Sequence, residues 1–298
     1  MSQASPTQTA PAAPAPRPVS QTREALRVFV RNPAAVIGLI MLAAILAVTV
    51  FGPMVMEADP FEIVSAPMDP PGSEYALLGS DYLGRDVLTG IVYGGRATLL
   101  VGLVAAVLSV AIGVTVGALA GYYGGWVDEV LMRITEFFQV MPTLLLAMVL
   151  VTLFSPSLAT ISIAIGVASW TSNARLARAE FLRLRQREYV MAERVIGAGN
   201  GRIIWKVILP NALAPLIVSA TLVVGTAILF EAGLSFLGLG DPNIMSWGLI
   251  IGNNRPYILT AWWAVTLPGV AIFLTVLAVS LIGDGLNDAF NPKLRGRE

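Results

Sequence analysis

The stretch ATLLVGLVAAVLSVAIGVTVGALAGYYGGWV, residues 97–127, decides the fold, because it contains no charged side chain over 31 consecutive positions. An α-helix rises about 1.5 Å per residue, and about 20 apolar residues cross the roughly 30 Å hydrocarbon core of a bilayer. The stretch is therefore long enough for one membrane-spanning helix, which we place near Thr98–Tyr122.

Other apolar segments predict five more spans. The uncharged run from Phe137 to Ala174 has 38 residues, and one helix of that length would reach about 57 Å, nearly twice the thickness of the hydrocarbon core. We expect the turn Ser155-Pro156-Ser157 to divide this run into two spans. The sequence thus predicts an all-α membrane protein with six transmembrane helices, near residues 34–51, 98–122, 137–154, 158–171, 213–230 and 262–282.

The composition supports this class of protein and excludes several others. Of the 298 residues, 56% are hydrophobic and 13% are charged, and the mean hydropathy is +0.74. A soluble domain could not bury this much apolar surface, and disorder of the whole chain is excluded for the same reason. The chain has no His and no Cys, so histidine bases, thiol nucleophiles and the commonest zinc ligands are absent. The net charge of zero leaves no basic surplus for binding nucleic acid.

Lys and Arg are distributed unevenly between the predicted loops, and this asymmetry predicts the orientation in the membrane. Sixteen of the 19 basic residues lie before the first span, between spans two and three, between spans four and five, or after the last span. These segments share one side, and we therefore expect both the N and the C terminus to be cytoplasmic. The opposite side has three arginines, Arg85, Arg96 and Arg255. The same side has the acidic residues Glu57, Asp59, Glu62, Asp69, Glu74, Asp81 and Asp86.

The chain divides into three parts. Residues 1–24, which begin with a run of Pro, Ala, Ser, Thr and Gln, are expected to form a disordered tail. Residues 25–78 are expected to contain the first transmembrane helix and an extracytoplasmic loop, and residues 79–298 the main transmembrane domain. In the second predicted span, glycines recur every four residues and form a small face that favours close helix packing. These glycines are Gly113, Gly117, Gly121 and Gly125.

The loop of residues 173–210 is about 38 residues long and contains no predicted span, whereas connections have a median length of about 4–6 residues. Within it, residues 187–197 have the spacing of a short helix with charged residues on one side. Its apolar stripe consists of Tyr189, Ala192, Val195 and Ile196. Gly197 and Gly199 would end the helix, because Gly adopts left-handed backbone at low cost. The stripe suits either a protein partner in the cytosol or the lipid headgroups, and the residues alone leave both interpretations open.

The end of this loop resembles the signature of ABC-importer permeases. That signature is an EAA triplet, three residues, Gly, nine residues and Ile-x-Leu-Pro. Here Gly197 is followed, after nine residues, by Val207-Ile208-Leu209-Pro210. In the triplet position, Met191-Ala192-Glu193, only the central Ala192 agrees, and Val207 replaces the usual Ile.

Further stretches resemble the C-type subunits of the dipeptide/oligopeptide/nickel branch of this superfamily. They are residues 79–96, residues 231–248 and residues 283–292, together with the shorter Arg31-Asn32-Pro33. The last of the long stretches has Asn291-Pro292 where that branch more often has Asp-Pro. The resemblance extends over residues 25–294 in the expected order.

This resemblance implies a type I ABC importer permease, a non-catalytic multi-pass subunit of a bacterial inner membrane. The subunit would form half of a pathway for di- or oligopeptides with a homologous B-type permease. Two ABC ATPase subunits would bind ATP and Mg, and an extracytoplasmic solute-binding protein would deliver the cargo. This chain would bind no cofactor, and it has no Walker A pattern. The residues implied in coupling to the ATPases are Tyr189, Ala192, Glu193, Ile196, Gly197, Leu209 and Pro210.

Four ionisable residues are candidates for pathway or outer-side contacts. Glu231 ends the fifth predicted span, where a charge is costly and a functional role is a default hypothesis; a structural role in a buried network is the alternative that we favour. Asp81, Arg85 and Asp86 precede the second span. If that segment is helical, Asp81 and Arg85 form an ion pair four residues apart. A docking surface for the binding protein is the alternative.

Two other classes of function remain to be compared. A stand-alone secondary transporter would usually have internal repeats and ionisable residues at the centres of its spans, and neither is evident here. An intramembrane enzyme without His or Cys would need a Ser-Lys or paired-Asp site, and no such pair lies within the spans. Import of nickel or another small solute by the same architecture is a further alternative to peptide import.

Overall fold

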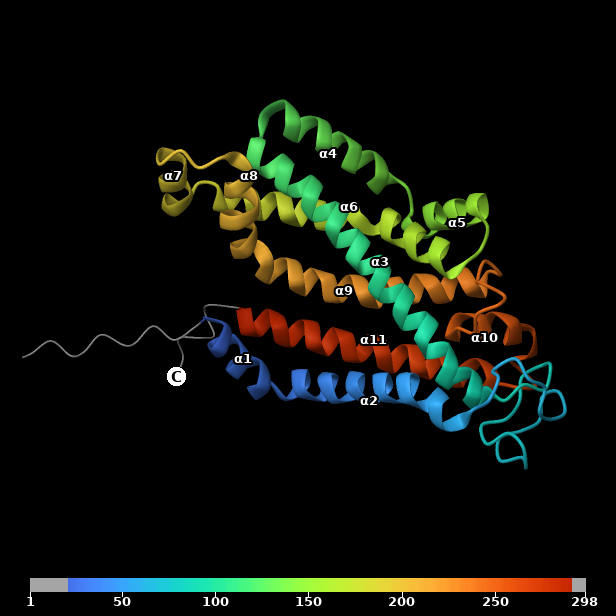
Figure 1. Ribbon diagram of the computed structural model, residues 1–298. Helices are drawn as coiled ribbons and strands as arrows, with labels where there is room; N and C mark the ends of the chain where they lie inside the picture. Colours follow the sequence, from blue (N-terminus) through green and yellow to red (C-terminus); the bar gives the residue numbers. More distant parts are fainter. Residues whose placement is uncertain (1–20, 291–298) are drawn as a thin grey trace, which may run out of the picture.

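A computed structural model of the chain describes residues 21–290, and the regular secondary structure of this part is helical (Figure 1). It has no β-strand and only two isolated bridges, between Ile63 and Arg85 and between Ser80 and Asp86. The expected all-α class is therefore confirmed. The helices are α1 (Gln21–Arg31), α2 (Pro33–Met56), α3 (Val87–Tyr123), α4 (Gly125–Val140), α5 (Thr143–Phe154), α6 (Leu158–Leu184), α7 (Glu188–Val195), α8 (Asn200–Arg202), the π-helical η1 (Ile203–Ile208), α9 (Leu209–Phe236), α10 (Trp247–Asn254), the 3-10 helix η2 (Arg255–Tyr257) and α11 (Trp263–Phe290).

Four helices are long and apolar enough to cross a membrane: α2, α3, the continuous segment Asn200–Phe236 and α11. The bent pair of α4 and α5 is a fifth candidate, so the described residues give four or five spans rather than the expected six. The predicted span at residues 158–171 lies within α6, which packs along α3. The second half of α6 contains Asn173, Arg175 and Arg178, and these polar residues lower its hydropathy.

The prediction of one continuous span at residues 137–154 is wrong. The chain breaks after Val140, and α4 and α5 meet at a bend of 86°. Pro142 explains the break, because it lacks an N–H and disfavours helical backbone at the preceding Met141. The predicted division between Phe154 and Leu158 is confirmed: Ser155 has a φ of +68°, which ends α5, and the Ser157 hydroxyl accepts from the Thr160 N–H at 3.1 Å.

The boundary of the N-terminal tail also differs from expectation. Helix α1 begins at Gln21, so the last four residues of the tail predicted over 1–24 are helical. Residues 1–20 and 291–298 lie outside the described residues. The rest of the predicted tail, Asn291-Pro292 and the three basic residues of the C-terminal segment belong to these ranges.

The glycine face of α3 packs directly against α6. A Cβ atom at Gly113, Gly117 or Gly121 would collide with backbone or Cβ atoms of α6, so only glycine permits this approach. The expected close packing is therefore confirmed at three of the four glycines. Gly125 is the exception, because it begins α4 and has open space around it.

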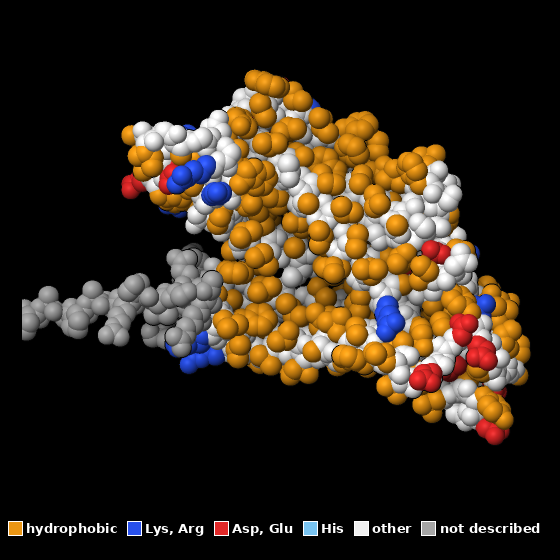
Figure 2. Space-filling view, viewed as in Figure 1, with side chains coloured by type: hydrophobic (Ala, Val, Ile, Leu, Met, Phe, Trp, Pro, Cys, Tyr) orange, Lys and Arg blue, Asp and Glu red, His pale blue; other side chains and the backbone are white. Residues whose placement is uncertain are grey.

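The two ends of the bundle differ in charge. Figure 2 shows Lys and Arg side chains gathered where α1, α7 and α8 lie, and Asp and Glu side chains gathered at the opposite end. Helix α1 and the end of α11 lie at the same end of the bundle, since the Asn32 side chain donates to the Asp288 carboxylate at 3.0 Å. The unequal distribution of basic and acidic residues that the loops predict is thus present between the two ends of the bundle.

Arg96 of α3 replaces a hydrogen bond that Pro53 removes from α2. Pro53 lies inside α2 and cannot donate to the carbonyl oxygen of Thr49, four residues earlier. The Arg96 Nε atom donates to that oxygen at 2.8 Å, and the Nη2 atom donates to the Val50 carbonyl at 2.6 Å. The side chain thereby fastens α2 to α3 at the point where the helical ladder of α2 is interrupted.

A double-mutant cycle on Arg96 and Pro53 tests whether Arg96 replaces the missing hydrogen bond. Arg96→Ala should lower the free energy of unfolding by about 1–2 kcal/mol, because two carbonyl groups lose their donor. In a Pro53→Ala background the cost should be smaller, since residue 53 regains an N–H for Thr49. Denaturing-detergent titrations of the four proteins measure both costs, with the exposed Arg133→Ala as a control. An equal cost of Arg96→Ala in both backgrounds would contradict the assignment.

Candidate functional site

Helix α7 is the short helix that the sequence predicts within the 173–210 loop. It spans Glu188–Val195, and the predicted glycine end is confirmed at Gly197, whose φ is +83°. The Gly197 N–H donates to the Arg194 carbonyl at 3.0 Å and the Ala198 N–H to the Glu193 carbonyl at 3.0 Å, which closes the C-terminus. Gly199 plays no such part, because its φ is −67° and it precedes α8.

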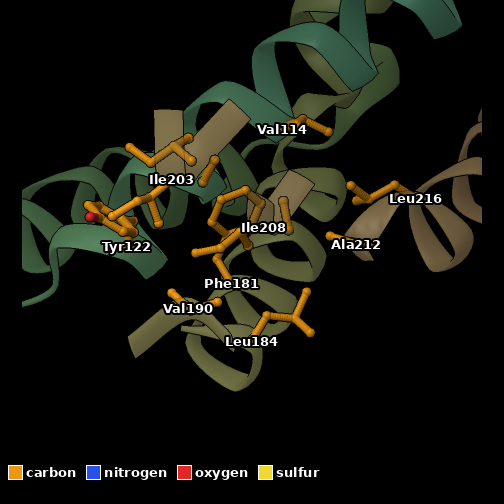
Figure 3. Close-up of a cluster of buried hydrophobic side chains, with 12 residues drawn as sticks. Val114, Tyr122, Phe181, Leu184, Val190, Ile203, Ile208, Ala212 and Leu216 are labelled. Atoms are coloured by element: carbon orange, nitrogen blue, oxygen red, sulfur yellow. The ribbon is translucent and has the colours of Figure 1, made fainter. Parts of the chain in front are cut away.

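A single side chain of α7, that of Val190, is buried in the bundle. It is 0% exposed and belongs to a hydrophobic cluster that joins α3, α6, α7, η1 and α9 (Figure 3). The buried members are Val114, Ala118, Tyr122, Ala177, Phe181, Leu184, Val190, Ile203, Ile204, Ile208, Ala212 and Leu216. The burial of Val190 therefore anchors α7 to the helices that extend into the membrane.

Polar contacts with the end of α3 also hold α7 in place. The Arg194 guanidinium lies 5.2 Å from the centre of the Tyr122 ring, in a cation–π geometry. The Tyr122 hydroxyl donates to the Asn200 side chain at 2.8 Å, just after α7. Arg185, before α7, donates to the Gly121 carbonyl at 3.0 Å. Both flanks of α7 are thus bonded to one turn of α3.

The predicted apolar stripe faces away from the bundle. Val195 is 86% exposed and Ile196 75% exposed, and Tyr189 and Ala192 are also exposed. On the side where the sequence places charged residues, Val190 is buried and the Arg194 guanidinium lies over the Tyr122 ring. Arg187 and Glu188 of the same side are exposed. The stripe is therefore a small apolar surface presented on a fixed support.

The other predicted coupling residues lie near the bundle, at the contact of α7 with α8 and at the start of α9. The Glu193 carboxylate lies 3.7 Å from the Arg202 Nε atom and connects α7 with α8. Leu209 is half-buried against the cluster that contains Val190, whereas Pro210 is exposed in the first turn of α9. The structure thus separates the predicted set into an exposed tip that ends at Gly197, a base with Glu193 and Leu209, and the exposed Pro210 at the start of α9.

Glu231 is a buried hydrogen-bonding centre. It is 2% exposed, and its Oε1 atom accepts from the Ser235 hydroxyl at 2.9 Å and the Ser246 hydroxyl at 2.8 Å. Its Oε2 atom accepts from the Thr98 hydroxyl at 3.3 Å. These contacts connect α9 with α3 and with the start of α10, which supports the structural role favoured above.

Asp81 and Arg85 do not form the expected helical ion pair. The segment before α3 is an irregular loop, and the Asp81 Oδ1 atom accepts from the backbone N–H groups of Leu83 at 2.8 Å and Arg85 at 2.9 Å. The Arg85 guanidinium instead lies over the Phe61 ring, 5.1 Å from its centre. Asp86 caps α3, since its Oδ2 atom accepts from the Thr89 N–H at 2.9 Å. These contacts show that all three residues stabilise the loop and the start of α3.

Sequence reasoning missed a second polar centre, at Asn173 of α6. Its side chain is 1% exposed, donates to the Ser109 hydroxyl of α3 at 3.0 Å and accepts from the Ser219 hydroxyl of α9 at 2.7 Å. The available signal was an Asn within a charge-free run, where a polar side chain needs a partner. The two polar centres hold α3 and α9 together at different depths.

Two valines of α7, one buried and one exposed, form a matched pair that tests whether the burial of Val190 holds α7 in place. Val190→Ala should destabilise the docking of α7 by about 2 kcal/mol, because two buried methyl groups and their contacts are lost. Hydrogen exchange of residues 188–197 should then accelerate by about thirtyfold. Val195→Ala removes the same atoms from an exposed position and should leave the exchange unchanged. Equal rates for the two variants would show that Val190 does not hold α7.

Comparisons with known proteins identify the family. Residues 113–296 match the binding-protein-dependent transport system inner membrane component, and residues 20–72 match the N-terminal transmembrane domain of oligopeptide transport permease C. The chain is 41% identical to the dipeptide transport system permease protein DppC of Alkalihalophilus pseudofirmus, over 93% of this chain and 91% of the relative. It is 41% identical to the di/tripeptide permease DppC of Pseudomonas aeruginosa, with 93% of each chain covered.

The fold comparison agrees with the sequence comparison. An inward-facing structure of the MetNI methionine ABC transporter matches 66% of this chain and 96% of its own with a TM-score of 0.52, at 22% identity. The oligopeptide permease OppC of Bacillus subtilis is 37% identical over 93% of this chain and 91% of its own length. The chain therefore belongs to the binding-protein-dependent transport system inner membrane components, as an ABC permease of the C type found in dipeptide and oligopeptide transport systems.

Proposed function

We propose that this chain imports di- or oligopeptides, forming half of the translocation pathway with a homologous B-type permease. The observation that supports this most directly is the identity of 37–41% to dipeptide, di/tripeptide and oligopeptide permeases over nearly the whole chain. An extracytoplasmic binding protein delivers the peptide, and two ATPase subunits bind ATP and Mg. The chain itself binds no cofactor and catalyses no reaction.

The exposed stripe of α7 is the surface that contacts an ATPase in this proposal. Four apolar or small side chains at the tip of a cytosolic helix suit a partner cleft, and their removal from water would favour docking. The base of α7 is bonded to α3 and packed on α6 and α9. A displacement of the tip would therefore move these helices together instead of bending a loop. Tyr189, Ala192, Ile196 and Gly197 supply the contact, whereas Glu193, Leu209 and Pro210 support it.

The proposed location is the inner membrane of a bacterium, with both termini and α7 in the cytoplasm. The excess of Lys and Arg at the end formed by α1, α7 and α8 supports this orientation (Figure 2). The acidic end, formed by the segments between α2 and α3 and between α9 and α11, then faces the binding protein.

Photocrosslinking tests the ATPase contact. A benzophenone amino acid at position 195 should capture an ATPase subunit in membranes containing the complete transporter, identified by peptides with a Walker A sequence. Position 259 is the control, because Leu259 is also highly exposed, at 96%, but lies at the opposite end. Crosslinks to lipid alone at position 195, in membranes that transport, would exclude the proposed contact.

Uptake measurements test the substrate. Deletion of the gene should abolish accumulation of labelled di- and oligopeptides in a strain that lacks other peptide importers, and the intact chain should restore it. Accumulation of labelled nickel should be unaffected in the same strains. Loss of nickel uptake with normal peptide uptake would favour the small-solute alternative.

A further inference from the structure

Arg96 has a positive charge that is paired with no carboxylate of the described residues. Its side chain is exposed, and two of its N–H groups donate to α2 carbonyl oxygens; within residues 21–290 no carboxylate pairs with it. Thr49 lies seven residues before the end of α2 at Met56, which corresponds to about 10 Å along the helix. The guanidinium is therefore held below the end of a membrane-spanning helix, where an unpaired charge is costly. An anion at this depth would satisfy it.

An apolar groove extends from Arg96 toward the middle of the bundle. It encloses about 610 Å³, within the range of about 300–1,000 Å³ typical of small-molecule sites. Helices α2, α3, α9 and α11 line it. The lining includes Leu42, Leu46, Leu103, Val224, Val279 and Ile282, and its polar side chains apart from Arg96 are Thr49 and Thr221.

A second cavity adjoins this groove at the acidic end of the molecule. It shares Arg96 and Leu100 with the groove and has polar side chains in its wall, those of Asp59, Tyr93 and Asn243. The order along the two cavities is thus carboxylate, guanidinium and hydrocarbon. This order is complementary to the ammonium, the phosphate and the acyl chain of a phospholipid with an amine in its headgroup.

We propose that this groove binds one amine-containing phospholipid, such as phosphatidylethanolamine, from the leaflet at the acidic end. Its phosphate pairs with Arg96, which has free N–H groups for charge-assisted hydrogen bonds. Its ammonium lies toward the Asp59 carboxylate, and one acyl chain fills the groove. A peptide fits this groove poorly, because its backbone N–H and C=O groups would face leucine and valine side chains without partners.

The bound lipid would fill the space between α2 and α3. These helices contact each other at Arg96, Thr49 and Val50, toward the acidic end, and the groove lies between them farther in. The acyl chain would occupy that space and complete the packing of α2. The site is separate from the surface of α7, and its test does not depend on transport.

Native mass spectrometry of the complete transporter tests the groove. The wild-type protein, extracted in mild detergent and supplied with phosphatidylethanolamine, should retain one molecule per copy of this chain. Leu46→Trp fills the groove and should lower the lipid-bound fraction about tenfold, the effect of about 1.4 kcal/mol. Leu39→Trp is the matched control, because Leu39 is an exposed residue of the same helix outside the groove, and it should retain the lipid.

Arg96→Gln in the Pro53→Ala background tests the phosphate contact while preserving the hydrogen bonds of α2. It should also lower the bound fraction about tenfold. Phosphatidylglycerol and phosphatidylcholine, added in place of phosphatidylethanolamine, should be retained less well. Equal retention of the three lipids, unchanged binding in Leu46→Trp, displacement of the lipid by a dipeptide, or a crosslink from position 46 to a partner subunit would each overturn the proposal.

Discussion

The absence of water from the hydrocarbon core constrains this structure more than any other factor, because every backbone N–H and C=O group there needs a partner within the protein. Helices meet this demand, and two of the interruptions in the fold have a specific compensation. Arg96 supplies the donor that Pro53 lacks, and Ser157 caps the start of α6 after the turn that follows α5. At Pro142 the chain bends by 86° instead of continuing. The position of Arg96 determines where α2 is bonded to α3, and the position of Pro142 determines where α4 ends and α5 begins.

A second consequence of the apolar environment is the way in which the bundle is held together. Apolar contacts between helices gain little over contacts with lipid, so close approach and buried polar groups decide the packing. The glycines of α3 allow α6 to approach, and Asn173 bonds both α3 and α9. Glu231 repeats this arrangement near the other end of α9. Helix α7 is attached to these same three helices through Val190, which connects the exposed tip of α7 directly with the bundle.

Hydropathy and charge patterns are sufficient to locate α2, α3, α9 and α11, because these helices are apolar all round and bounded by polar segments. They do not reveal the break at Met141-Pro142, since a count of charges does not register the missing N–H of proline. The short helix α7 is also evident from its spacing, but its orientation is not. Val190 shares its side of α7 with Arg187 and Arg194, and only the cluster formed with distant helices shows that Val190 is buried. Asp81 and Arg85 were misassigned because a four-residue spacing indicates a pair only where the backbone is helical.

The π-helical segment η1 joins the loop that carries α7 to α9, and its geometry sets the direction in which α7 points. A π-helical turn contains about one residue more than an α-helical turn. Deleting one residue from Ile203–Ile208 would restore α-helical geometry and rotate everything before it by about 100° relative to α9. The stripe on α7 would then point in another direction although each of its side chains were retained. The direction in which the stripe points therefore depends on the length of this segment and not on its composition alone.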